Sequence, residues 1–303
     1  MYLEHFGLTE YPFGLTPNTQ FFCALRVHQE ALNVLLVALH SGEGFIKITG
    51  EVGTGKTMLC RKLLNELDAS FVTAYIPNPA LSQAELLAVI AEELGIHSEK
   101  VFRQGSVLKR ISRHLLKVAA EGKHLVLVFD EAQAIPPDSL ELLRLLTNLE
   151  TESRKLLQIV LFGQPELDAL LMRPNLRQLR QRITFSYRLE RLGWGGTEHY
   201  LSSRLRVAGY NEEHLLTAPA YWFIHTYSRG TPRLLNILAH KAMMVAYGKG
   251  LRRVRANHVR AAAADTEGAR GVVRPDSPLW PVGLLVAAGA GWVALSGVGG
   301  IWP

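Results

Sequence analysis

Residues 50–57 combine three glycines, a lysine and two threonines at a spacing that suits phosphate chemistry. They satisfy the pattern G-x-x-x-x-G-K-S/T and lie between an apolar run at 45–49 and a helix-patterned run at 58–64. The glycines let backbone N–H groups face phosphate oxygens, and the following helix adds its positive end. We therefore expect a nucleotide-binding phosphate loop (P-loop), with Lys56 at the β and γ phosphates and the Thr57 hydroxyl on magnesium.

Two acids follow an apolar run further along the chain. Residues 125–129 read Leu-Val-Leu-Val-Phe, which is typical of a central strand buried on both faces of a parallel sheet, and Asp130 and Glu131 come next. Asp130 is placed to hold magnesium, and Glu131 to orient and deprotonate the water that attacks a γ-phosphate. The alternative is a pair of solvated acids at a strand end. Together with the P-loop, the acids favour nucleotide hydrolysis. The predicted nucleotide-binding residues are Gly50, Glu51, Val52, Gly53, Thr54, Gly55, Lys56, Thr57 and Asp130, and the predicted metal ligands are Thr57 and Asp130.

Strand-like and helix-like segments alternate through the first two thirds of the chain. This alternation predicts an α/β fold with a parallel sheet covered by helices on both faces. Strand signals stop at about residue 193, and only helical patterns follow. We expect an α/β nucleotide-binding domain over 1–192 and a small all-helical domain over 193–268. The expected strands lie at 45–49, 71–76, 125–129, 156–162 and 183–187, and the later helices near 197–208, 213–227, 231–247 and 256–264.

Composition places the chain among ordinary folded proteins with an uneven distribution of charge. It has 303 residues, of which 48% are hydrophobic and 20% charged, enough for one large domain or two smaller ones. Its two cysteines lack a metal-ligand spacing and are compatible with a reducing compartment. Residues 1–172 carry 15 Lys and Arg against 20 Asp and Glu, whereas residues 173–303 carry 18 against 7. The basic second part suits nucleic acid, an anionic membrane surface or a neighbouring subunit's nucleotide.

The motifs taken together resemble those of the AAA+ ATPases. The order is a P-loop, the Asp-Glu strand tip, a polar strand tip at 163–164, an arginine cluster and Gly-Thr-Pro-Arg at 230–233. More narrowly, Tyr-Leu-Glu-His-Phe-Gly-Leu at 2–8, Asp-Glu-Ala-Gln at 130–133 and Phe-Gly-Gln-Pro-Glu-Leu at 162–167 resemble the general secretion pathway A family. That family includes the ATPase of mannose-sensitive haemagglutinin (MSHA) pilus biogenesis, to which the layout is most similar.

The resemblance covers roughly residues 1–265 and implies both a function and partners. It implies a cytoplasmic ATPase domain attached to the bacterial inner membrane, using ATP and Mg²⁺ in the assembly of a secretion channel or type IV pilus. A homo-oligomer, in a ring or partial ring, and envelope assembly proteins are the implied partners. The alternative is a DNA-associated AAA+ ATPase of the transposition-regulator or replication-loader type, which the basic second half supports. The uncharged terminal segment and the absence of a helix-turn-helix or zinc signature favour the envelope function, so nucleic acid is disfavoured as a partner but stays open.

The resemblance also assigns roles to individual side chains. Gln164 would be a first sensor of the γ-phosphate or attacking water, or simply a polar strand end. Arg233 would be a second sensor from the helical domain, or merely a residue that starts a helix after a proline. Family members pack the stretch around 11–13 and His28 over the adenine, although core packing explains these residues equally well. Three arginines before the fifth strand would supply a finger to the next subunit, or contact nucleic acid or lipid: Arg177, Arg180 and Arg182.

The last part of the chain suggests a membrane segment. From Leu279 to Trp302 there are 24 residues without a charge, enough at about 1.5 Å per residue to cross a hydrocarbon core about 30 Å thick. Arginines precede this segment, which predicts a basic linker at 269–278, a transmembrane helix at 279–302 and a single-pass inner-membrane location with the ATPase inside. Six of the 24 residues are glycine, so a disordered or partner-bound tail is the alternative.

Overall fold

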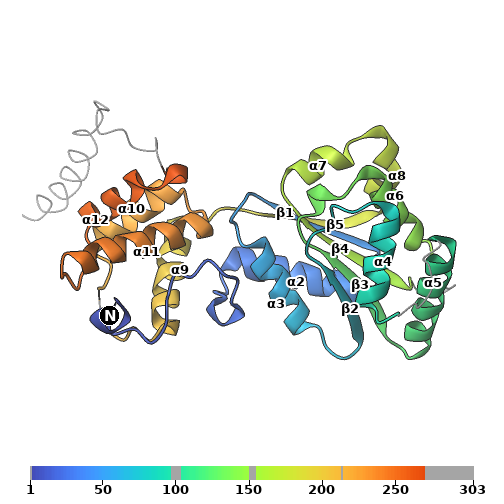
Figure 1. Cartoon of the computed structure of the whole chain (residues 1–303), viewed down its shortest axis with the longest axis horizontal. Coiled ribbons are helices and arrows are strands. Elements are labelled where there is room, and N and C mark those ends of the chain that lie inside the picture. The colour runs from blue at the N-terminus through green and yellow to red at the C-terminus, as the bar shows by residue number, and fades with distance from the viewer. Residues whose placement is uncertain (1, 97–103, 150–154, 213, 270–303) are drawn as a thin grey trace, which may run out of the picture.

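A parallel five-stranded sheet forms the centre of the larger part of the molecule (Figure 1). The computed structural model describes residues 2–96, 104–149, 155–212 and 214–269. The strand order is β2-β3-β4-β1-β5 with every pairing parallel, which confirms the predicted sheet. The three inner strands β3, β4 and β1 are largely buried, as expected for strands covered on both faces, whereas the edge strands β2 and β5 are only partly buried. The bounds are β1 Phe45–Gly50, β2 Phe71–Ile76, β3 His124–Phe129, β4 Leu157–Gly163 and β5 Ile183–Leu189.

Helices cover both faces of this sheet, as the alternation of segments predicts. Strand β3 shows how the two faces are filled: Leu125, Leu127 and Phe129 belong to one apolar cluster, and Val126 and Val128 to another. The first cluster includes side chains from α4 (Gln83–Glu93), α5 (Gln104–Ala120) and α6 (Pro137–Leu146). The second includes side chains from α2 (Arg26–His40) and α3 (Lys56–Glu66). Two short helices, α7 (Glu166–Leu171) and α8 (Arg177–Arg182), lie between β4 and β5.

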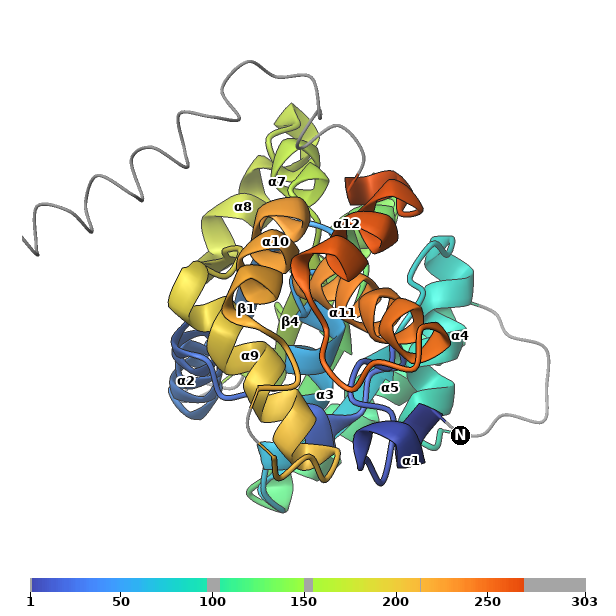
Figure 2. The same ribbon diagram turned by 90° about the vertical axis from the view of Figure 1, so that its left-hand side faces the viewer.

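Within the described residues, four α-helices follow β5 and pack together as a bundle beside the sheet (Figures 1 and 2). They are α9 (Trp194–Val207), α10 (Ala218–Ser228), α11 (Pro232–Gly248) and α12 (Ala256–Ala264), close to the predicted ranges. Their small and branched apolar residues share one buried cluster that is separate from the two clusters at the sheet. We call this group the helical bundle.

The N-terminal segment packs with the helical bundle instead of the sheet. Helix α1 (Tyr2–Phe6) contributes Tyr2 and Phe6 to the bundle's core, and Phe13 and Phe21 follow them there. The predicted span of 1–192 for the first domain did not anticipate this, because aromatic residues do not reveal in the sequence which distant helix will cover them. The chain thus passes between the bundle and the sheet twice, before α2 and after β5.

The membrane prediction needs correction. Within the described ranges, we find no helix whose length and apolar character would let it span a bilayer. The expected location as a single-pass inner-membrane protein is overturned by this finding. Residues 279–302, on which that expectation rested, and residues 270–278 of the expected linker lie outside the described residues.

The connection between β5 and the bundle generates a stability prediction at Gly230. This residue has φ +72°, and a Cβ built on it would lie 1.9 Å from the backbone oxygen of Leu192. Its own carbonyl accepts a hydrogen bond from the Leu192 N–H at 2.9 Å. We expect Gly230→Ala to lower the free energy of unfolding by about 2–4 kcal/mol, because the backbone must move apart and adopt a strained φ.

Urea unfolding monitored by circular dichroism measures this loss. Gly195 in α9 is the matched control, since a Cβ there meets nothing within 4 Å. Its replacement by alanine should raise the free energy of unfolding by about 0.5–1 kcal/mol, as alanine usually does in a helix. Equal effects at the two positions would contradict the assigned role of Gly230.

Candidate functional site

The P-loop turns between β1 and α3 and is approached closely from two sides. Gly53 has φ +80° and Gly55 has φ +102°. A Cβ on Gly53 would lie 2.6 Å from the Cβ of Arg233, and one on Gly55 would lie 2.9 Å from Nε2 of His28. Only glycine allows this backbone conformation and this proximity. The Arg233 N–H also donates to the Gly53 carbonyl at 3.1 Å, so α11 begins directly on the P-loop.

Lys56, the first residue of α3, is held inside the curve of the P-loop. Its Nζ donates to the carbonyl oxygens of Gly50 at 2.7 Å and Glu51 at 3.1 Å. Burial lowers the pKa of Lys56, and the carboxylates of Glu131 and Asp130 oppose that shift by favouring the ammonium form. The loop thus presents a cation together with its backbone N–H groups, which suits a polyphosphate.

Asp130 follows directly after β3, and its carboxylate accepts a hydrogen bond from Thr57, the residue after Lys56. The Thr57 hydroxyl donates to Asp130 Oδ2 at 2.6 Å, and the Glu131 N–H donates to Oδ1 at 3.0 Å. Burial raises the pKa of Asp130, and these two hydrogen bonds oppose the rise. The structure therefore brings the two predicted metal ligands together. A hydroxyl and a carboxylate are oxygen donors of the kind that Mg²⁺ takes in nucleotide sites, so the residues fit that ion.

Glu131 adopts a left-handed backbone conformation, with φ 51°. Strained conformations of this kind concentrate at functional sites, where the surrounding structure enforces them. Its Oε2 accepts hydrogen bonds from the amides of Gln133 and of Gln164, the latter at 2.9 Å. Burial would raise the pKa of Glu131, but the two amide donors and nearby Lys56 bring it below its usual value. Glu131 is accordingly a carboxylate, able to accept a proton.

Gln164 meets Glu131 because their strands are neighbours. It follows β4, which pairs with β3 in parallel, so the two carboxyl ends share one edge of the sheet. Its backbone N–H also donates to Gln133 Oε1 at 2.9 Å. Gln133 thus bridges the two residues, a positioning role that we did not predict for it. Its only signal in the sequence is its place in the Asp-Glu-Ala-Gln tetrad.

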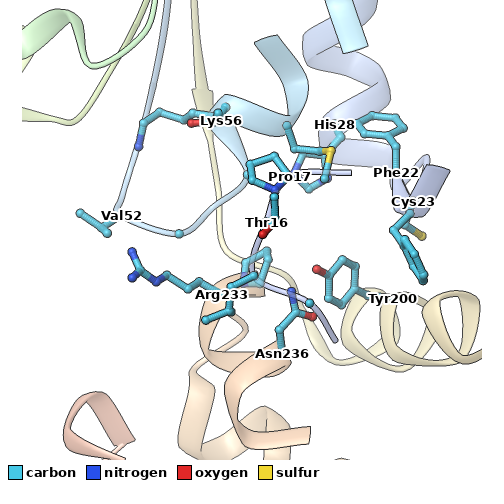
Figure 3. Close-up of a pocket in the computed structure, with 18 of the residues that line it drawn as sticks. Thr16, Pro17, Phe22, Cys23, His28, Val52, Lys56, Tyr200, Arg233 and Asn236 are labelled. Atoms are coloured by element: carbon cyan, nitrogen blue, oxygen red, sulfur yellow. The ribbon is translucent and has the colours of Figure 1, made fainter. Parts of the chain in front are cut away.

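A cavity of about 360 Å³ joins these groups to the helical bundle. The volume lies within the usual range for small-molecule sites, about 300–1,000 Å³. Figure 3 shows Lys56 and Val52 on the P-loop side, Arg233, Asn236 and Tyr200 on the bundle side, and Thr16 and Pro17 between them. Glu131, Gln164 and Arg233 all line this cavity, so the structure gathers them in one place. The roles assigned to them stay predictions.

Other predicted residues lie elsewhere. Arg177, Arg180 and Arg182 are exposed on α8 and are not part of the cavity's lining. Tyr11 stacks on Tyr2, with ring centroids 5.6 Å apart, and Phe13 is buried in the bundle. Tyr11 is 57% exposed, and only Phe13 is part of the core. Neither side chain lines the cavity, whereas residues 14–17 and His28 do. The cavity residues that sequence reasoning missed are Gly14, Leu15, Thr16, Pro17, Phe21, Phe22, Cys23, Met58, Tyr200, Arg204, Pro232 and Asn236.

Comparison with known proteins agrees with this geometry. Residues 39–171 match the family model described as AAA domain. The chain is 42% identical over 295 residues to General secretion pathway protein A of Aeromonas hydrophila, covering 97% of this chain. This chain is an AAA-domain relative of general secretion pathway protein A. It spans about half the length of that relative, 53%. The finer resemblance to the MSHA pilus ATPase stays a prediction.

Several solved structures of other proteins have a fold similar to that of this AAA-domain protein. Cdc6p from Pyrobaculum aerophilum matches with a TM-score of 0.67 and 20% identity, covering 84% of this chain and 70% of that one. The ORC2 protein of Aeropyrum pernix in its ADP form matches with a TM-score of 0.64 and 18% identity, covering 96% of this chain and 80% of that one. At these identities the likeness establishes the fold alone.

His28 generates a pH prediction for the P-loop of this AAA-domain protein. Its Nε2 lies 3.0 Å from the Thr54 carbonyl, which can only accept, so Nε2 carries the proton, and its buried Nδ1 has no hydrogen-bond partner in the described structure. Burial lowers the pKa of His28, and the bond to Thr54 opposes this. Below about pH 6.5, His28 therefore binds a proton more readily in the unfolded chain than in the folded one. The free energy of unfolding consequently falls as the pH falls.

We expect His28→Gln to reduce this acid sensitivity, because glutamine keeps an amide donor for Thr54 and does not titrate. The measurement is the difference in urea-unfolding free energy between pH 8 and pH 5.5, for the variant against the wild type. The same substitution at exposed His199 is the control and should leave the difference unchanged. An acid sensitivity in His28→Gln equal to that of the wild type would contradict the role given to His28.

Proposed function

We propose that this protein is a magnesium-dependent ATPase of the AAA+ type that serves the assembly of a bacterial secretion channel. The observation that carries the proposal is the hydrogen-bonded chain from Thr57 through Asp130 and Glu131 to Gln164, set against the P-loop inside one cavity. It joins a phosphate-binding loop, an oxygen donor pair, a carboxylate base and an orienting amide, which are the parts that γ-phosphate hydrolysis requires.

In the proposed reaction Glu131 acts on water. Its carboxylate accepts a proton from a water molecule whose oxygen bonds to the γ-phosphorus while the bond to the β–γ bridging oxygen breaks, releasing ADP and phosphate. Gln164 holds the carboxylate by one amide hydrogen and keeps its other hydrogen for the water or the γ-phosphate. Lys56 binds the β and γ phosphates. Magnesium, held by Thr57 and Asp130, would neutralise the charge on the phosphate oxygens.

Arg233 would report the nucleotide to the helical bundle. We propose the domain division at 192/193, with the bundle acting as a lid whose helix α11 starts at the P-loop. The hydrogen bond from the Arg233 N–H to Gly53 supports this, because a movement of α11 must alter the loop. A guanidinium is a planar cation whose N–H donors fit phosphate oxygens. Closure of the lid would then depend on the γ-phosphate.

The exposed arginines of α8 support the proposal of an oligomer. Arg177, Arg180 and Arg182 are absent from the lining of their own chain's cavity, as expected for a finger that acts in a neighbour. Arg182 reaches the Thr147 hydroxyl at 3.2 Å, and Arg180 lies against the sulfur of Met172 at 2.8 Å. A finger supplied by the adjacent subunit would make hydrolysis depend on assembly.

The pathway in this proposal rests on the relative from Aeromonas hydrophila, whose name assigns it to general secretion. No observation favours a type IV pilus over a secretion channel, so we limit the proposal to secretion. The alternative of a DNA-associated ATPase would gain from the fold shared with Cdc6p and ORC2, but at 18–20% identity that likeness carries the fold alone.

The chemistry is tested by separating binding from turnover. Lys56→Ala should abolish tight ATP binding, because Lys56 meets the ground-state phosphates. Glu131→Gln should bind ATP with magnesium as the wild type does and lower kcat by about 100-fold or more, because only the base for the water is lost. Calorimetric titration with ATP and phosphate release measure the two quantities. Glu131→Gln protein with wild-type turnover, or a wild-type rate that rises only with duplex DNA, would overturn the proposal.

The proposal that an arginine finger from one subunit acts in the site of its neighbour is tested by mixing variants. One of Arg177→Ala, Arg180→Ala and Arg182→Ala should lose most of the activity, and an equimolar mixture with Lys56→Ala should recover part of it. Each subunit then supplies what the other lacks, an intact P-loop or an intact finger. Arg173→Ala is the matched control, since Arg173 is also exposed beside α8, and it should hydrolyse ATP normally. Three single variants with wild-type rates at every protein concentration would rule out the finger.

A further inference from the structure

Among the described residues, one arginine of the helical bundle is buried in the wall of the cavity without an acidic partner. Arg204 in α9 is only 4% exposed. None of the ion pairs found among the described residues includes it. Desolvating a guanidinium costs several kcal/mol unless hydrogen bonds and geometry compensate, so a buried arginine of this kind calls for a structural account.

The compensation comes from the N-terminal segment. Arg204 Nε donates to the Pro12 carbonyl at 2.6 Å, and one terminal nitrogen lies 3.4 Å from the Gly14 carbonyl. The other terminal nitrogen donates to the Tyr200 hydroxyl at 3.3 Å. The guanidinium also lies over the ring of Phe21, 4.7 Å from its centroid. Cation–π contacts of this kind are strongest when water is excluded.

Arg204 therefore holds both ends of residues 12–23, which we call the strap. The strap is irregular apart from one short turn at 19–21, so its own backbone does little to fix its position. Its members Thr16, Pro17 and Phe22 line the cavity. Arg61 of α3 gives the strap one further tie, through the Pro17 carbonyl at 2.8 Å, but that contact is exposed to solvent.

The later part of the strap, at Phe22 and Cys23, forms the end of the cavity that is away from the Lys56 ammonium group. In Figure 3, Phe22, Cys23 and Tyr200 lie on the side opposite Val52 and the Lys56 ammonium group. A nucleoside triphosphate with its phosphates in the P-loop must place its base toward these apolar and ring side chains. A flat base needs a slot of defined width, and strap position sets that width.

We propose that Arg204 is a positioning residue for nucleotide binding: it clamps the strap to α9 and thereby shapes the base-binding end of the cavity. The inference rests on the proposed function. Arg204 acts through the strap, and not on the phosphates or the attacking water. Its substitution should therefore change the affinity for the whole nucleotide, base included. Lysine cannot replace it, because a single ammonium lacks the planar fork that reaches both carbonyls and lies over a ring.

The experiment compares ATP with inorganic tripolyphosphate, which has the phosphates and no base. Full-length wild type, Arg204→Met and Arg204→Lys are titrated calorimetrically with each ligand in the presence of magnesium, and steady-state ATPase activity is measured in parallel. We expect both variants to bind ATP about 10- to 100-fold more weakly, the range for losing hydrogen bonds to a charged group. Tripolyphosphate affinity and kcat at saturating ATP should stay within about twofold, because the P-loop and Glu131 are untouched.

Arg206→Met on the same helix is the control, since Arg206 is exposed, and it should match the wild type with both ligands. Wild-type ATP affinity in Arg204→Met and Arg204→Lys would overturn the inference while leaving the proposed function intact. An equal loss for ATP and tripolyphosphate, or a loss in kcat alone, would overturn it as well, because the effect would then lie at the phosphates or in the chemistry. If Arg204→Met does not fold, Arg204→Lys decides by the same comparison. A wild-type protein that binds no ATP would instead remove the proposed function.

Discussion

The close approach of two helices to the P-loop is the constraint on which the site depends. Gly53 meets α11 and Gly55 meets α2, at distances that leave no room for a side chain. The turn from β1 into α3 is therefore held between the sheet's own helix and the first turn of a bundle helix. Packing that tight leaves few intermediate arrangements, because close-packed contacts do not deform continuously. The loop and the bundle consequently form one mechanical unit.

Two adjacent acids at the end of β3 acquire different properties from their surroundings. Asp130 is buried, which raises its pKa against the pull of its two hydrogen bonds. Glu131 receives two side-chain amide donors, which outweigh burial and lower its pKa. Environments that set two neighbouring acids apart in this way are typical of sites that give each acid its own task. Gln133 and Gln164 are thus as much part of the site as the acids they support.

The N-terminal segment connects the two parts of the molecule in a way that a single linker would not. Helix α1 is buried in the bundle, and the strap then returns along the cavity to α2. A displacement of the bundle must also move the strap, because the Thr9 N–H donates a hydrogen bond to the Ala208 carbonyl and Arg204 donates one to the Pro12 carbonyl. Bundle position, cavity shape and P-loop geometry are coupled through ordinary backbone contacts, without any long-range pathway.

The sequence by itself determined the parts of the protein that depend on local order. Strand-like runs identified all five strands, and the spacing of glycine, lysine and hydroxyl residues identified the P-loop. Gln164 could be placed beside Glu131 because the carboxyl ends of parallel strands share one edge. Hydropathy in the last segment suggested a location that the described helices do not support, since a local count of apolar residues does not establish a membrane-spanning helix.

Only the tertiary structure decided the other half of the cavity. Arg204 and Pro12 are 192 positions apart, and His28 of α2 meets Thr54 of the P-loop. These contacts arise from how the bundle and the N-terminal segment pack, and no spacing rule in one sequence reports them. Tyr200 and Asn236 look like ordinary helix residues in the sequence for the same reason. Local motifs determine where phosphate chemistry can occur, whereas long-range packing decides what surrounds it.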